Sequence, residues 1–253
     1  MLTNYINRKR KSKDILLMTH IVIGYPDLPT SLKIVETMVD SGVDLMELQI
    51  PFSEPIADGP TILYANHIAL KNGVKTKDCF EFSSKITQMF DIPFLFMTYY
   101  NILFKYGVSN FAIDTKKSGL KGAIVPDLPP EEGKEYLDSM KENNLNPIFI
   151  FTPTSTDERL KLLSSVASGF IYCVARKGIT GQKTDFNSEL ENYIKRCKSF
   201  TNLPLALGFG IKEKEEIDFL KGKVDIAVIG TQSIKVFEEK GLTGLKEYLK
   251  SLR

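Results

Sequence analysis

The chain has 253 residues, of which 43% are hydrophobic and 25% are charged, and this composition is typical of a globular protein with a large apolar core. It excludes a disordered chain, a collagen and a coiled coil. Lys and Arg number 33 against 31 Asp and Glu, and the net charge of +2 disfavours a protein that binds nucleic acid by neutralising phosphates.

The N-terminal residues predict a helix and neither a targeting nor a membrane segment. Arg8–Lys13 is a basic run that we interpret as the solvated face of a helix. The apolar stretch that follows contains His20 and no cleavage site of small residues. No run approaches the ~20 apolar residues of a membrane span. The three cysteines show no CxxC spacing and cannot all pair. We therefore expect a cytoplasmic protein without membrane contact.

Eight short apolar runs recur along the chain and are predicted to be strands. They are Ile15–Ile23, Asp44–Ile50, Pro93–Tyr99, Gly122–Pro126, Pro147–Phe151, Phe170–Ala175, Pro204–Gly208 and Asp225–Ile229. Segments with helical spacing of apolar residues lie between them. Several of these segments end in a glycine that can close a helix in the left-handed conformation. These glycines are Gly42, Gly119, Gly169 and Gly222.

The regular alternation of strand and helix predicts the fold. Continuous apolar strands such as Ile226–Ile229 are typical of a parallel sheet that is buried on both faces. Eight such units in about 250 residues fit a closed (β/α)₈ TIM barrel better than an open doubly wound sheet. No linker or repeat divides the chain, so we expect one barrel domain over residues 1–253, with an N-terminal helix. The connections after strands 2 and 6 are extended, and such loops build the active site of a barrel.

Two carboxylates mark the second of these strands and its loop. Glu47 lies inside an apolar strand, and Asp58 follows in the loop beyond it. A carboxylate in a barrel mouth is costly to bury unless it is used or paired, and desolvation raises its pKa toward the range useful for proton transfer. The alternative is that Glu47 points outward or makes a structural hydrogen bond.

Glycine-rich turns follow the last three strands and predict a phosphate site. They are Lys177–Gly181, Gly208–Gly210 and Gly230–Ser233. Exposed amides in front of a helix N-terminus bind phosphate, and the seventh and eighth loops are the usual position in a barrel. We expect a small phosphorylated substrate, although these segments could simply be tight turns. There is no Walker loop or nucleophile elbow, and two scattered histidines do not predict a metal site.

Two further positions stay open at this point. Tyr172 is adjacent to Cys173 in the sixth strand, and only one of the two can face the barrel interior, so Tyr172 could be a core residue. Asp127 follows the fourth strand, where it could begin a helix or hold a substrate or partner.

Taken together, several motifs resemble the tryptophan synthase α subunit. They are Glu47 with Pro51–Pro60 (PFSEPIADGP), Gly24–Asp27, Arg176–Gly181, Gly208–Ile211 and Ile229–Thr231. The second-loop motif is highly specific, and the resemblance covers nearly the whole chain. It implies a carbon–carbon lyase of tryptophan biosynthesis that cleaves indole-3-glycerol phosphate to indole and glyceraldehyde 3-phosphate.

The resemblance also implies a role for each matching position. Glu47 matches the general acid–base group that protonates indole C3 and helps remove the glycerol hydroxyl proton. Asp58 matches the carboxylate that accepts a hydrogen bond from the indole N–H and stabilises the positive charge there. Substrate-binding positions are Tyr99, Tyr172, Thr180, Gly181, Gly210, Gly230 and Thr231. Asp127 matches the hydrogen-bonding region that couples loop 2 to loop 6.

The resemblance further implies a β subunit as partner in an α₂β₂ assembly. Indole would pass through a tunnel to the β subunit, which carries pyridoxal phosphate, whereas no cofactor or metal is expected in this chain. The sequence departs from the family pattern at three positions, where Gln49 replaces glycine, Glu54 replaces aspartate and Thr231 replaces serine. Thr231 keeps the hydroxyl, and Glu54 lies where the family contacts its β partner. Gln49 lies on the same strand face as Glu47, without an evident role.

Two other functions remain open, and a third is disfavoured. A freestanding lyase that releases indole without a β partner would use the same residues. Another phosphate-binding barrel enzyme, such as an isomerase, would share the glycine turns but would not need the pair Glu47 and Asp58. A catalytically weak allosteric partner of the β subunit would lack one of these two carboxylates, and both are present.

Overall fold

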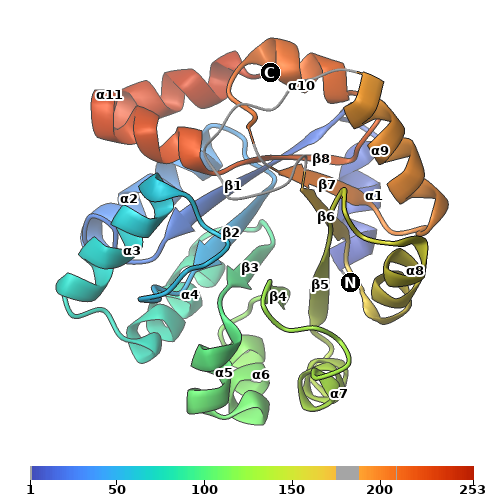
Figure 1. The fold of residues 1–253 in the computed structure, drawn as a ribbon. Coiled ribbons are helices and arrows are strands. Elements are labelled where there is room, and N and C mark those ends of the chain that lie inside the picture. The colour runs from blue at the N-terminus through green and yellow to red at the C-terminus, as the bar shows by residue number, and fades with distance from the viewer. Residues whose placement is uncertain (1, 175–187, 209) are drawn as a thin grey trace.

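The computed structural model describes residues 2–174, 188–208 and 210–253. Eight parallel strands close into a barrel in chain order, and β8 pairs with β1 (Figure 1). The strands are β1 (Leu16–Val22), β2 (Leu45–Gln49), β3 (Phe94–Met97), β4 (Gly122–Ile124), β5 (Asn146–Phe151), β6 (Ile171–Val174), β7 (Leu205–Gly208) and β8 (Ile226–Ile229). The predicted (β/α)₈ barrel is confirmed. The predicted runs agree with these strands within two residues at either end, because apolar burial continues past the last ladder hydrogen bonds.

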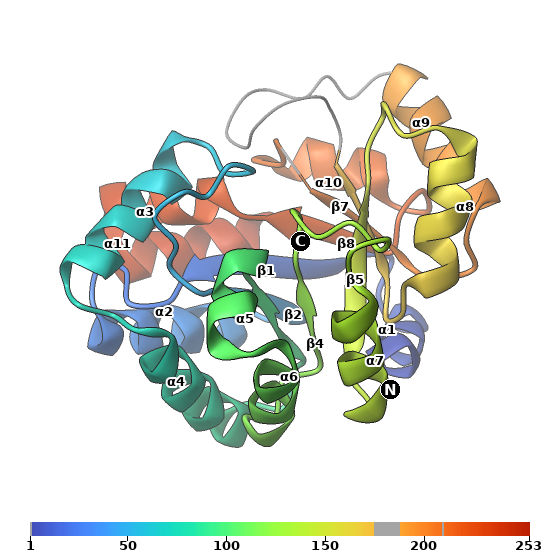
Figure 2. The same ribbon diagram turned by 60° about the horizontal axis from the view of Figure 1, so that its bottom comes forward.

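Helices surround the strands in both views of the ribbon (Figures 1 and 2). They are α1 (Leu2–Arg10), α2 (Leu28–Asp40), α3 (Pro60–Lys71), α4 (Thr76–Met89), α5 (Tyr100–Tyr106), α6 (Val108–Lys117), α7 (Lys134–Glu142), α8 (Asp157–Val166), α9 (Ser188–Ser199), α10 (Lys214–Leu220) and α11 (Thr231–Ser251). The glycines expected at helix ends have positive φ, for example +87° at Gly42 and +84° at Gly169. Among the described residues, no helix is long and apolar enough to cross a membrane.

The long connection after β2 contains a loop and the helices α3 and α4, as expected. We call residues 50–59 loop 2. The connection predicted to be extended after β6 falls on residues 175–187, outside the described residues.

The core has two parts, one inside the barrel and one between the barrel and the helices. Side chains at alternate positions of the strands fill the interior, among them Leu16, Leu45 and Ile226. Leu2 and Ile6 of α1 pack on this interior cluster where the strands begin, and Figure 1 shows α1 behind the strands. The helix therefore closes the N-terminal end of the barrel and leaves the opposite end for a site.

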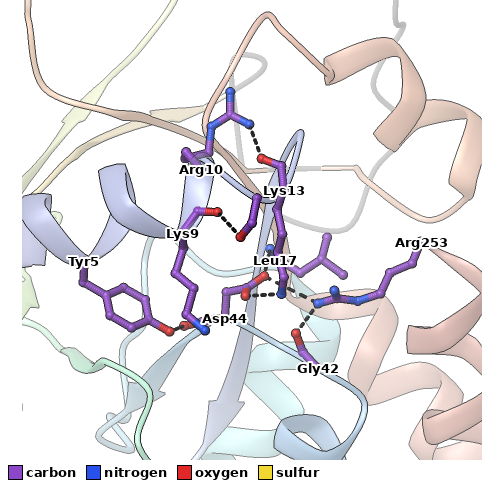
Figure 3. Close-up of polar contacts among 9 residues, drawn as sticks. Tyr5, Lys9, Arg10, Lys13, Leu17, Gly42, Asp44 and Arg253 are labelled. Atoms are coloured by element: carbon purple, nitrogen blue, oxygen red, sulfur yellow. Dashed lines mark hydrogen bonds and ion pairs between the residues drawn. The ribbon is translucent and has the colours of Figure 1, made fainter.

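A cluster of charged side chains reinforces this closed end (Figure 3). Asp44 is 2% exposed, accepts a hydrogen bond of 3.1 Å from the backbone N–H of Leu17, and pairs with Lys13 and Arg253. Arg10 pairs with Asp225 at 3.2 Å. The interpretation of the basic run as a solvated helix face is wrong for Arg10 and Lys13, because Arg10 pairs with the half-buried Asp225 and Lys13 with the buried Asp44.

Candidate active site

A cavity opens at the carboxyl end of the barrel. Its volume is about 860 Å³, including the part open to solvent. Its floor is formed by His20, Glu47, Asp58 and Tyr172, and its rim includes the turns after β7 and β8. Active sites of (β/α)₈ barrels lie at this end.

Glu47 projects into the barrel from β2. Leu45 is on the same face and belongs to the interior cluster, whereas Met46 and Leu48 pack toward the helices. The Glu47 side chain therefore faces inward, and the alternative of an outward side chain is wrong. Glu47 is 3% exposed, and its Oε1 atom has no hydrogen-bond partner among the described residues.

The partner of Glu47 is His20 on the neighbouring strand β1. The two residues are register partners, and Nδ1 of His20 lies 3.2 Å from Oε2 of Glu47. Burial lowers the pKa of His20, but the hydrogen bond and charge of Glu47, together with the charge of Asp58, outweigh it and leave that pKa above its usual value. The two carboxylates therefore favour the protonated form of the imidazole.

Sequence reasoning missed this contact of His20. Every residue of β1 is buried, so no alternation of polar and apolar residues marked its inner face. The available signal was a histidine in an apolar strand next to the strand of Glu47.

Asp58 lies just before α3 and is 8% exposed. Its Oδ2 atom accepts hydrogen bonds from Gln49 Nε2 at 2.7 Å and from the Tyr99 hydroxyl at 2.9 Å. Burial raises the pKa of Asp58, and the charge of His20 and these two hydrogen bonds oppose that rise. Asp58 is thus held in a fixed orientation beside the cavity. Gln49, which had no evident role in the sequence, is one of the groups that hold it.

Tyr99 holds loop 2 by a ring contact and by hydrogen bonds. It is fully buried, and its ring stacks on Phe52 with centroids 5.2 Å apart. Its hydroxyl accepts a hydrogen bond of 3.2 Å from the Ala57 N–H. Tyr99 is not among the residues that line the cavity. Its contact with the site is through Asp58.

Asn66 on α3 fixes the start of the same loop. Its Oδ1 atom accepts the backbone N–H of Phe52 at 2.9 Å, and its Nδ2 donates to the Ile62 carbonyl. This residue was also missed, because a buried asparagine inside a helix gives no sequence signal of the loop that it holds.

Tyr172 faces the cavity, and Cys173 faces the helices. Tyr172 packs with the interior cluster, whereas Cys173 belongs to the outer one. Burial and the nearby charges of Glu47 and Asp58 raise the pKa of the Tyr172 hydroxyl. A Cβ atom at Gly208 would lie 2.4 Å from that hydroxyl oxygen, so a glycine there leaves the space that the ring occupies.

One side of the rim combines backbone amides and cations. Gly210, Gly230 and Thr231 line the cavity there, and Gly230 immediately precedes α11. Lys212 and Lys235 lie on the same rim and were not predicted. The N-terminus of α11 and these cations favour an anion. Thr180 and Gly181 lie outside the described residues.

Two predicted positions lie away from the floor of the cavity. Asp127 is exposed, and its carboxylate accepts the backbone N–H of Tyr100 at 2.9 and 3.1 Å at the start of α5. Asp127 thus holds the start of α5, which precedes it in the chain, and not the start of the helix that follows it. Glu54 is exposed in loop 2, close to Ile56, whose exposed fraction is 73%.

The described residues contain no group of three or more His, Cys, Asp or Glu that could hold a metal ion. The chemistry that the floor can perform is proton exchange by two carboxylates, next to a rim that favours an anion.

Comparisons with known proteins identify the family. The family model for the tryptophan synthase alpha chain matches residues 6–251. The chain is 58% identical to the tryptophan synthase alpha chain of Desulforapulum autotrophicum and 56% identical to that of Syntrophotalea carbinolica, with full coverage of both proteins in each case. A solved tryptophan synthase structure of Mycobacterium tuberculosis superposes with a TM-score of 0.92 at 30% identity, covering 99% of this chain and 96% of that chain. A solved structure of a protein from Aquifex aeolicus VF5 gives a TM-score of 0.92 at 34% identity, with the same coverage.

Proposed function

The chain belongs to the tryptophan synthase alpha chain family, and we propose that it cleaves indole-3-glycerol phosphate to indole and glyceraldehyde 3-phosphate. The observation that carries this proposal is the pair of buried carboxylates, Glu47 and Asp58, on the floor of one cavity with an anion-favouring rim. Such a cavity can receive an apolar ring at the floor and a phosphate at the rim.

The reaction requires that the indole ring first becomes an electron acceptor. Glu47 in its acid form donates a proton to C3 of the ring, and Asp58 accepts a hydrogen bond from the ring N–H and stabilises the developing positive charge. The Glu47 carboxylate then takes the proton of the adjacent glycerol hydroxyl. The bond between C3 and the side chain breaks, its electron pair returns to the ring, and the hydroxyl carbon becomes the aldehyde.

The remaining site residues bind the substrate or hold the site together. Tyr172 is assigned to the wall next to Glu47, and Tyr99 acts through Asp58. The amides of Gly210, Gly230 and Thr231 are assigned to the phosphate, with Lys212 and Lys235 nearby. Thr180 and Gly181 are assigned to the same substrate from the family motif. Asp127 remains assigned to the coupling between loops 2 and 6, and its carboxylate accepts the N–H of Tyr100 at the start of α5.

We propose that the chain works with a β subunit in an α₂β₂ assembly, that the β subunit carries the pyridoxal phosphate, and that indole passes between them. A tryptophan synthase complex of Pyrococcus furiosus, with a TM-score of 0.85 at 30% identity, supports this proposal. The exposed tip of loop 2, with Glu54 and Ile56, is the surface assigned to the partner. A single domain over residues 1–253 and a cytoplasmic location belong to the same proposal.

The test is a steady-state assay of the purified chain on indole-3-glycerol phosphate, with and without a cognate β subunit. Cleavage that increases when the β subunit is added supports the coupled function. High cleavage that does not respond to the β subunit favours a freestanding lyase, and no cleavage in either case contradicts the assignment.

A further inference from the structure

Two polar side chains that the proposed reaction does not use lie between its two carboxylates. His20 on β1 and Gln49 on β2 are 4% and 0% exposed. One end of each meets a carboxylate, since His20 Nδ1 lies 3.2 Å from Glu47 Oε2 and Gln49 Nε2 lies 2.7 Å from Asp58 Oδ2.

The other ends of these side chains have no hydrogen-bond partner among the described residues. The two atoms are Nε2 of His20 and Oε1 of Gln49, and both are buried. Because Nε2 of Gln49 donates to Asp58, the carboxamide oxygen must face away from Asp58. Gln49 lies on the same face of β2 as Glu47, the register partner of His20, and its side chain is the smallest of the causes that raise the pKa of His20. Buried polar atoms are normally paired, and a protonated imidazole has a second N–H donor that suits a carboxamide acceptor.

We propose that His20 and Gln49 form a polar bridge between Glu47 and Asp58, in which protonated His20 donates one N–H to Glu47 and turns the other toward Gln49. This inference rests on the proposed function, because it makes both residues positioning residues for that reaction. The bridge holds Glu47 by Oε2 and leaves its unpartnered Oε1 atom to exchange a proton with the substrate. It holds Asp58 in the orientation that meets the ring N–H.

The charged groups around His20 favour its protonated form. Among the described residues, the charged groups that act on His20 are Glu47 from β2 and Asp58 from loop 2. Tyr172 from β6 lines the same cavity, and Lys212 and Lys235 lie on its rim. The charge of Glu47 raises the pKa of Asp58, and the charge of His20 lowers it. An imidazolium between the two carboxylates offsets their repulsion. Gln49 suits the bridge because a carboxamide can accept from the imidazolium and donate to a carboxylate at the same time.

The first test measures the protonation of His20 directly and needs no catalysis. The chain has two histidines, and the other, His67, is exposed on α3. In a His67→Gln variant, the imidazole signals in an NMR titration therefore come from His20 alone. We expect its midpoint to lie above the ordinary value of about 6.5 and to fall when Glu47→Gln is added. A midpoint at or below the ordinary value overturns the bridge.

The second test is kinetic and uses His20→Phe, which keeps a planar ring without N–H groups. We expect kcat to fall about tenfold or more with KM within about threefold. The acid limb of the pH profile is expected to move to higher pH, because Asp58 loses the cation whose charge lowers its pKa. His20→Gln, which can still donate to Glu47, is expected to recover part of the loss in kcat. His67→Gln is the matched control, with unchanged cleavage.

A double variant tests whether the two side chains act as one unit. His20→Phe combined with Gln49→Met is expected to lower kcat no further than the more severe single change, because either change breaks the bridge. The bridge is overturned if the losses in kcat are additive. It is also overturned if His20→Phe has the kcat and pH profile of the unaltered chain. In both cases the proposed lyase function stands. An unaltered chain that cleaves no substrate, with His20 still titrating above its ordinary value, overturns the proposed function and leaves the bridge supported.

Discussion

The carboxamide nitrogen of Gln49 lies 2.7 Å from Oδ2 of Asp58, so the last residue of β2 orients a carboxylate of the loop that follows it. Both carboxylates of the proposed reaction and one of the groups that hold them therefore belong to the short segment from Glu47 to Asp58. The family pattern has glycine at position 49, and a glycine could not make this contact.

Replacing Gln49 by methionine removes that hydrogen bond at nearly constant side-chain length. The hydrogen bond lowers the pKa of Asp58, so its loss raises that pKa. If cleavage requires ionised Asp58, the loss of activity on acidification will begin at a higher pH in this variant than in the unaltered chain. We expect kcat at neutral pH to decrease about tenfold, because hydrogen bonds to charged groups contribute about 1.5–3 kcal/mol. The pH dependence of indole formation measures this, and an unchanged acid limb would contradict the role of Gln49.

The isosteric changes Glu47→Gln and Asp58→Asn test the two carboxylates themselves. We expect each to lower kcat by ~10²-fold or more, the usual contribution of a general acid–base group or a charge-stabilising group. Thermal denaturation followed by circular dichroism checks that each variant folds. Turnover within about fivefold of the unaltered chain, in either folded variant, would remove that residue from the mechanism.

The contact between Gly208 and Tyr172 predicts an effect of a single methyl group. In Gly208→Ala the new Cβ atom would lie 2.4 Å from the tyrosine hydroxyl oxygen, so the ring must move, and the cavity is the open space beside it. We expect a lower kcat/KM for indole-3-glycerol phosphate, with overpacking costing about 1–3 kcal/mol of stability. Gly222→Ala is a matched control for stability, because nothing lies within 4 Å of its Cβ position and only its positive φ is strained. Equal kinetics in the two variants would show that the position of Tyr172 does not matter.

The charge cluster around Asp44 predicts a change in stability without a change in chemistry. Asp44→Ala removes the acceptor of the Leu17 N–H and the partner of Lys13 and Arg253. Because the two cations are partly exposed, we expect a loss of about 2–3 kcal/mol in the free energy of unfolding, less than for a fully buried pair. Urea denaturation measures this loss. Asp44→Asn, which can still accept from Leu17, is expected to lose less. A large loss of kcat in the folded Asp44→Ala variant would contradict the separation of this cluster from the site.

The strands could be predicted because they depend on local pattern, whereas the same pattern left the direction of the Glu47 side chain open. Apolar runs bounded by glycine and proline identify strands, and the specific motif around Asp58 identifies loop 2. The contacts of His20 could not be predicted, since they depend on the register that aligns it with Glu47 across two strands. The same holds for Asn66, which reaches loop 2 only because α3 folds back beside it.

The interpretation of the basic run as a solvated helix face was wrong for a related reason. Charge alone predicts solvent exposure, but Lys13 has a buried acid, Asp44, as its neighbour in space and not in sequence. Asp127 likewise holds the start of a helix that precedes it in the chain. In each case the missing information was which segments the closed barrel brings together.

The closed end of the barrel, formed by α1 and the charged side chains around Asp44, has a practical consequence for protein engineering. The closed end is held by Leu2, Ile6 and a set of ion pairs, whereas the mouth is held by hydrogen bonds around two carboxylates. The two ends share none of these partners, so substitutions at one end should add to those at the other in their effect on stability. Stabilising substitutions can therefore be selected at the closed end first. The added free energy of unfolding then offsets the losses that substitutions in the substrate cavity cause.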